Sequence, residues 1–153
     1  MKFDYNKICS EFSFDCPADF NFAFDVLAKK ALEPNKLALI SIDRDGNHVQ
    51  DVTYKELDQS SSRFANALLS LGVLKTDNIL VVLPRIPEWY YVLFGCAKMG
   101  AVAMPGTNLL TQNDIEYRLD MQRYHYAVVR GTTWGALLGG AHCYCYCFCN
   151  LDA

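Results

Sequence analysis

The sequence predicts an α/β fold in which parallel strands alternate with helices. Three observations predict it: short apolar runs that end at Pro or Gly, helical stretches between them, and short connections. From residue 57 onward the predicted order is helix, strand, helix, strand, helix, strand, which is typical of parallel strands joined by right-handed crossovers. A helix and a β-hairpin precede these parallel strand–helix units.

The composition is that of a globular chain. Hydrophobic residues make up 52% and charged residues 20% of the 153 residues, so a core can form. The net charge is −3 and no basic stripe is present, which argues against nucleic acid as a partner. The first residues lack the apolar core of a secretory signal. No run approaches the roughly 20 predominantly apolar residues of a membrane-spanning helix.

The N-terminal third predicts a helix and a hairpin. Residues 21–32 are rich in Phe, Ala, Leu and Lys and stop before Pro34, as a helix would. Residues 37–43 and 48–52 are two predicted strands, and Asp45-Gly46 between them favours a tight turn. We expect these two strands to pair as a β-hairpin.

The best-specified element is the helix that begins after Thr53. Thr53 and Glu56 have the spacing of a capping box, in which both side chains satisfy free backbone N–H groups. Gly72 favours a stop at the C-terminal end. At helical spacing, four apolar side chains fall on one face of this helix: Leu57, Phe64, Leu68 and Leu71.

The next units repeat this pattern. Residues 79–83 form an uninterrupted apolar run, as expected for a strand covered on both faces. Residues 88–98 predict a helix between Pro87 and Gly100 that has almost no polar face and should be deeply packed.

Three further elements complete the predicted sheet. Residues 101–104 form a short strand that ends at Pro105. Thr111 can cap a helix over residues 112–122, where Asp114 favours the positive end of the helix dipole. Residues 126–129 are the last predicted strand.

A composition boundary follows residue 130. Residues 131–153 show no helical period, contain many glycines and alternate Cys with aromatic residues. We therefore divide the chain into residues 1–130, part of an α/β domain, and a Gly/Cys-rich tail over residues 131–153.

The seven cysteines do not suit a secreted disulfide framework. Cys9, Cys16 and Cys96 are scattered, the others crowd into the tail, and the total is odd. This distribution favours a cytoplasmic chain.

The tail has two interpretations. Four thiols, Cys143, Cys145, Cys147 and Cys149, lie beside His142 and could hold zinc or copper. Structural zinc sites, however, typically use Cys pairs that are far apart in sequence, whereas strict alternation points successive thiols to one side of an extended strand. The favoured interpretation is a tail that arose from a frameshift or splice error, with no metal site.

Five strings carry a family resemblance: Phe20–Ala23, Thr53–Leu57, Leu83–Trp89, Met104–Thr107 and Asp114–Leu119. In this order and spacing they resemble AMP-forming acyl-CoA synthetases of the medium-chain type, which belong to the acyl-adenylate-forming superfamily. The resemblance covers about residues 12–130 and implies the N-terminal part of the synthetase fold.

The resemblance implies an acid–thiol ligase that works in two steps. A fatty acid attacks the α-phosphate of Mg-ATP to give an acyl-adenylate, and CoA then displaces AMP to give a thioester. The family's phosphate loop and its catalytic Lys lie beyond the matching region. We therefore expect a truncated AMP-dependent synthetase domain that binds neither ATP, Mg²⁺ nor CoA and is inactive alone.

One segment is a candidate for the substrate site. Gly106, Thr107, Asn108 and Leu109 follow a strand end, where open α/β sheets place ligand loops, and the resemblance implies that they lie near the CoA and acyl tunnel. The alternative is a simple turn, because Pro-Gly redirects the chain. Leu109 weakens the case for a substrate site, since some relatives carry Gln there and Leu cannot donate a hydrogen bond to CoA.

No residue is assigned a catalytic role. His48, His125 and His142 are isolated in the sequence, and no carboxylate or serine is spaced to suggest a triad. Arg85 could meet an anion, but an ion pair or a solvated side chain is favoured. Trp89 could stack on adenine, but core packing is favoured.

Three classes of function stay open. The first is a fragment of a fatty acid–CoA ligase, cytoplasmic or, by family, in the mitochondrial matrix. The second is a small protein with a Cys-rich metal-binding tail. The third is a remnant that associates with an intact synthetase.

Overall fold

A computed structural model describes residues 4–13, 16–107, 109–111, 113–115, 117–118 and 126–129. Residues 113–115 and 117–118 are helical. None of the helices within these described ranges is long and apolar enough to cross a membrane. The other elements are, in chain order, α1 (Tyr5–Glu11), η1 (Ala23–Ala28), α2 (Lys29–Ala31), β1 (Leu37–Ile42), β2 (His48–Thr53), α3 (Tyr54–Ser70), β3 (Asn78–Val82), α4 (Glu88–Met99), β4 (Val102–Pro105) and β5 (Tyr126–Val129).

The described strands form two sheets. β1 and β2 pair antiparallel as the predicted hairpin. The second sheet is parallel, in the order β4-β3-β5. Its central strand aligns Leu80 with Met104 on one side and with Ala127 on the other. The predicted α/β fold with parallel strands is therefore confirmed.

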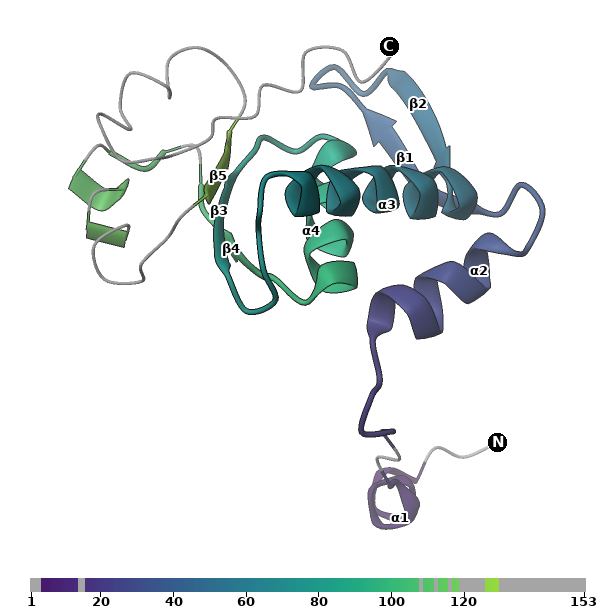
Figure 1. The fold of residues 1–153 in the computed structure, drawn as a ribbon. Coiled ribbons are helices and arrows are strands. Elements are labelled where there is room, and N and C mark those ends of the chain that lie inside the picture. The colour runs from purple at the N-terminus through teal and green to yellow at the C-terminus, as the bar shows by residue number, and fades with distance from the viewer. Residues whose placement is uncertain are drawn as a thin grey trace.

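The central strand β3 is covered on both faces, as the apolar run predicted. Ile79 and Val81 lie in one core cluster with residues of α3 and α4, such as Phe64. Leu80 and Val82 lie in a second cluster that includes Ile115. Figure 1 shows α3 and α4 on one side of this sheet and the helical segment after β4 on the other. Each such fully buried aliphatic side chain contributes roughly 1.5–3 kcal/mol.

Helix α3 begins at the predicted capping box. The Thr53 N–H donates to Glu56 Oε2 at 2.8 Å, and the Glu56 N–H donates to Thr53 Oγ1 at 3.2 Å. Of the predicted stripe, Leu57, Phe64 and Leu68 are buried and Leu71 packs against the core. Gly72 adopts a φ of 83° just past the helix end, a conformation that favours glycine.

A buried lysine joins α3 to α4, and no sequence pattern predicted it. Lys98 Nζ donates to Asp58 Oδ1 at 2.7 Å, to the Asp58 carbonyl oxygen at 2.8 Å and to Ser62 Oγ at 2.7 Å. The Lys98 side chain is only 6% exposed. A buried ammonium persists when its protons are hydrogen-bonded, so this network is the polar contact that sets one helix against the other.

Close backbone contact accompanies this network one turn earlier on α4. A Cβ atom at Gly95 would lie 2.9 Å from the Ser61 carbonyl oxygen and 2.6 Å from Phe64 Cδ1. Only glycine lets the two helices approach this closely. Gly95 and Lys98 therefore both contribute to the contact between α3 and α4.

Helix α4 is less deeply packed than its composition predicted. Only Val92, Gly95 and Cys96 are buried in it, and the Tyr90 side chain is exposed. The helix touches two clusters rather than one, because Tyr91 and Phe94 pack against the hairpin side. A helix between several elements keeps some aromatic surface in solvent, so this prediction was too strong.

The helical segment formed by η1 and α2 differs from the regular helix that was predicted over residues 21–32. It opens as a π-helix, η1, and continues as α2. Asn21 explains the opening: its Oδ1 accepts from the Ala23 N–H at 2.9 Å, and its Nδ2 donates to the Ala97 carbonyl of α4 at 2.8 Å. The tertiary anchor on α4 therefore shapes the first turn.

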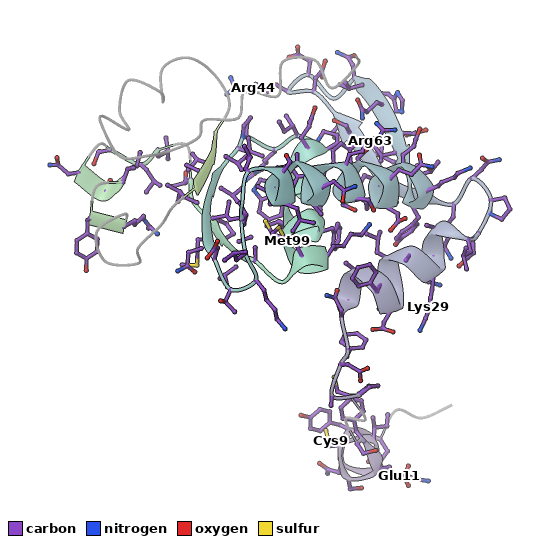
Figure 2. The ribbon with its side chains drawn as sticks, in the orientation of Figure 1. Cys9, Glu11, Lys29, Arg44, Arg63 and Met99 are labelled. Atoms are coloured by element: carbon purple, nitrogen blue, oxygen red, sulfur yellow. The ribbon has the colours of Figure 1, made fainter. Side chains whose placement is uncertain are left out.

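Two other features were not foreseen. Helix α1 has no buried residue, and Figure 2 shows its Cys9 and Glu11 apart from the other elements. The prediction that His48 is isolated is wrong, since its Nε2 lies 2.8 Å from Asp51 Oδ1. Both side chains are exposed on the hairpin, so the pair indicates no catalytic triad.

Lys98→Met should lower the free energy of unfolding by roughly 2–4 kcal/mol, because it leaves the Asp58 carboxylate without its cation. Lys55→Met, on the exposed side of α3, is the matched control and should stay within about 0.5 kcal/mol of the wild type. Urea denaturation followed by circular dichroism measures both. Equal losses in the two variants would contradict the assigned role of Lys98.

Acid should weaken the start of α3. Hydrogen bonds from the Thr53 backbone N–H and then from its hydroxyl lower the pKa of Glu56. A lowered folded-state pKa means that this stabilisation is complete above the unfolded pKa and is lost as pH falls through the folded pKa. The stability difference between the wild type and Glu56→Gln should therefore shrink from about pH 6 to about pH 3. A pH-independent difference in urea denaturation would count against the capping carboxylate.

Candidate functional site

The carboxyl ends of β3 and β4 lie at one edge of the parallel sheet. From β3 the chain passes to α4 on one face, and from β4 it passes to the helical residues 113–115 and 117–118, of which Ile115 packs on the other face. Adjacent strands whose connections leave toward opposite faces mark the position where open α/β sheets place ligand loops. The two segments at this edge, residues 83–87 and 106–111, are the candidate site.

Gly106 holds the second segment against the sheet. Its N–H donates to the Val81 carbonyl oxygen at 2.8 Å. A Cβ atom at this position would lie 2.8 Å from Leu110 Cδ1 and 3.1 Å from Val82 Cγ2. A methyl group at residue 106 would therefore have to displace the end of the Leu110 side chain and press on Val82, so the loop packs tightly against β3 here.

The residues after Gly106 form a turn held by a side chain. Thr107 Oγ1 accepts a hydrogen bond from the Leu109 N–H at 3.2 Å, and the Thr107 carbonyl accepts one from the Leu110 N–H at 3.3 Å. The Leu109 side chain is 82% exposed. Asn108 lies outside the described residues. A turn is thus present, and the role of Gly106, Thr107, Asn108 and Leu109 in a CoA and acyl tunnel stays a prediction.

The helix after this turn is capped as predicted. The Thr111 N–H and hydroxyl donate to Asp114 Oδ2 at 2.8 and 2.7 Å. The Thr111 hydroxyl and then its N–H hold the pKa of Asp114 below its ordinary value. Of the predicted range 112–122, residues 113–115 and 117–118 are helical and the rest lies outside the described residues.

The first segment of the edge carries little chemistry. Arg85 is exposed and forms no ion pair with any residue in the described ranges, so it is a solvated side chain. Trp89 packs edge-on against Tyr90, with ring centroids 5.4 Å apart, and lies against the larger core cluster. The core interpretation of Trp89 is confirmed.

The thiols of the described part offer no nucleophile at this edge. Cys96 is buried, and burial raises its pKa to about 12, so it stays protonated and inert. Cys9 and Cys16 are exposed and lie N-terminal to the sheet. Within the described ranges no group of three His, Cys, Asp or Glu side chains could hold a metal ion. The predicted tail thiols Cys143, Cys145, Cys147 and Cys149 lie outside those ranges.

The donors at this edge do not fit an ATP site by themselves. A phosphate cradle needs several backbone N–H groups and a fixed cation aimed at one point. Here the Gly106 N–H is used by Val81, and the Leu109 N–H is used by Thr107. Among the residues described at this edge, the two named N–H donors are therefore already used within the chain and do not form a phosphate cradle.

Comparison with known proteins identifies the family. The profile of the family described as AMP-binding enzyme matches residues 27–145. With its parallel sheet and ligand-loop edge, the chain belongs to the AMP-binding enzyme family. The match ends inside the tail, so the boundary at residue 130 stays a prediction.

The curated relatives are acyl-coenzyme A synthetases. The mitochondrial ACSM3 of Pongo abelii is 35% identical over 127 residues, which cover 78% of this chain and 22% of that protein. The mitochondrial ACSM2A of Homo sapiens is 37% identical over 127 residues, which cover 76% of this chain and 21% of that protein. The chain thus spans about a fifth of the length of these relatives.

Solved structures confirm the fold of acyl-adenylate-forming synthetases. A benzoate CoA ligase from Burkholderia xenovorans LB400 is 27% identical with a TM-score of 0.66, over 82% of this chain and 25% of that one. An acyl-CoA synthetase of Brucella canis has a TM-score of 0.73 at 20% identity, over 99% of this chain and 29% of that one. The second likeness shows the fold alone.

Gly106→Ala should lower the free energy of unfolding by about 1–3 kcal/mol, because the added methyl group overlaps Leu110 and Val82. Leu109→Ala, in the same loop but on an exposed side chain, should change it by no more than about 0.5 kcal/mol. Urea denaturation of both variants measures the difference. If Gly106→Ala were neutral, the loop would not be held against the sheet as described.

Proposed function

We propose that this chain supplies the opening strands and helices of an AMP-forming acyl-CoA ligase for medium-chain fatty acids. The observation that carries the proposal is the parallel β4-β3-β5 sheet with its ligand-loop edge, within a sequence whose relatives are acyl-coenzyme A synthetases. In the complete ligase the carboxylate attacks the α-phosphate of ATP and releases pyrophosphate. The thiol of CoA then displaces AMP from the acyl-adenylate.

The part played by these residues is to shape and support the site. Gly106 keeps its loop close to β3, which leaves Thr107 and Leu109 at the carboxyl edge of the sheet. In the proposal, residues 106–109 form part of the wall of the CoA and acyl tunnel. ATP and Mg²⁺ belong to the complete ligase, where the metal supplies neutralising charge for the phosphates.

We also propose that the chain alone is inactive. Adenylate formation needs preorganised donors around the transferred phosphoryl group, and the edge described above does not assemble them. The cytoplasm is the proposed compartment, and the mitochondrial names of the relatives make the matrix the alternative. The proposed protein partner of the chain is an intact synthetase.

The chain incubated with ATP, Mg²⁺, CoA and octanoate should yield neither octanoyl-CoA nor pyrophosphate above the blank. Mass spectrometry of the thioester and a coupled pyrophosphate assay measure the two products. The intact mitochondrial acyl-coenzyme A synthetase ACSM3 of Homo sapiens, another relative of similar identity, serves as the control. Turnover by the chain would overturn the proposed inactivity.

A chimera tests the positive half of the same prediction. Residues 27–130 of this chain, the family-matched part up to the proposed boundary, replace the matching segment of human ACSM3. A folded chimera should form octanoyl-CoA, and Leu109→Gln in it should lower the KM for CoA, since an amide can donate a hydrogen bond. A folded chimera without activity would contradict membership of these residues in an acyl-CoA ligase.

A further inference from the structure

The C-terminal turn of α4 is held by polar contacts from two directions. Lys98 Nζ is hydrogen-bonded to Asp58 and Ser62 on α3. The Ala97 carbonyl oxygen accepts a hydrogen bond from Asn21 Nδ2, in the segment before η1, at 2.8 Å. The other ion pairs of the described residues join side chains only three or four positions apart, so Lys98 with Asp58 is the one long-range pair there. Hydrogen bonds are directional, and these therefore fix how this end of α4 lies.

The opposite end of α4 begins at the candidate edge and is held in another way. Pro87 offers no side-chain hydrogen bond to cap the helix, and the Tyr90 side chain in the first turn is exposed. Trp89 and Val92 contact the larger core cluster, but apolar contact has no preferred direction. The place of this end along the helix axis therefore depends on the anchor at the C-terminal turn.

The helix between these two ends can transmit the position of the anchor. Lys98 lies about 16 Å from Pro87 along α4, because a helix rises about 1.5 Å per residue. A helix is a rigid element, so a shift at one end is carried to the other end. Residues 83–87 directly precede α4 and would move with it. The Gly106 loop would not follow, because its N–H is bonded to the Val81 carbonyl oxygen of β3.

We propose that Lys98 is a positioning residue for the candidate edge. Its ammonium fixes the place of α4 against α3 and thereby sets the separation between residues 83–87 and the Gly106 loop. The bonding partners of Lys98 lie on α3, so it acts on the edge through the helix. That this separation sets the width of a ligand site rests on the proposed ligase function.

A purely stabilising role for Lys98 predicts a different result. Lys98→Met leaves the Asp58 carboxylate without its cation and destabilises the whole chain. The double variant Lys98→Met/Asp58→Asn removes both charges, so most of that loss should be recovered. The directional contact between the helices is still missing in the double variant. Residues 83–87 should therefore stay displaced in it, although its stability returns.

Hydrogen exchange of the full chain, followed residue by residue with NMR, separates the two roles. The amides of the buried strand β3 report global unfolding, whereas those at the start of α4 report local opening. In the double variant the β3 amides and the Gly106 amide should exchange within about threefold of the wild type. The Trp89 and Tyr90 N–H groups, which donate to the carbonyl oxygens of residues 86 and 87, should exchange about 3 to 30 times faster.

Lys55→Met, on an exposed side chain of α3, is the control and should leave all these rates at wild-type values. The proposal would be overturned if Trp89 and Tyr90 in the double variant exchanged at the wild-type rate, or if they accelerated by the same factor as β3. A double variant that did not fold would also overturn it, because Lys98 would then be required for stability rather than position. The measurement needs no turnover, so its result is independent of the chimera experiment that tests the ligase function.

Discussion

The burial of β3 on both faces is the constraint on which the rest of this structure depends. A strand with no solvent-facing side needs helices on both sides of its sheet. Here α3 and α4 cover Ile79 and Val81, and the segment that contains Ile115 covers Leu80 and Val82. The connections from β3 and β4 must therefore leave toward opposite faces. That divergence creates the ligand-loop edge at the carboxyl ends of the two strands.

The helix pair on one face is set by a second, polar constraint. Lys98 reaches three oxygen atoms of α3, and Gly95 removes the side chain that would separate the two helices. A buried ion pair adds little net stability but is costly to break, so it favours one alignment over others. Because Val92 and Cys96 of α4 pack on β3, the same contact also fixes how the sheet meets its helices.

The candidate edge has the features of a scaffold for a binding site. The loop of Gly106 is hydrogen-bonded and lies close to the sheet, which suits the wall of a binding site. Catalysis of phosphoryl chemistry instead depends on charge and oriented donors. The chain spans about a fifth of the length of its curated relatives. Its structure therefore shows supporting strands, helices and loops rather than catalytic groups.

The sequence by itself determined the local elements, because their causes lie within a few residues. The capping box at Thr53, the helix cap at Thr111, the stop at Gly72 and the apolar run of β3 were all predictable from neighbouring side chains. Tertiary structure alone decided the order β4-β3-β5, the burial of Lys98 and the π-helical opening at Ala23. Each of these depends on contacts between residues far apart in the chain, such as Lys98 with Asp58, for which spacing in the sequence gives no signal. The candidate loop lies between these cases: Pro-Gly predicted its turn, but only the tertiary structure shows that residue 106 packs tightly against Leu110 and Val82.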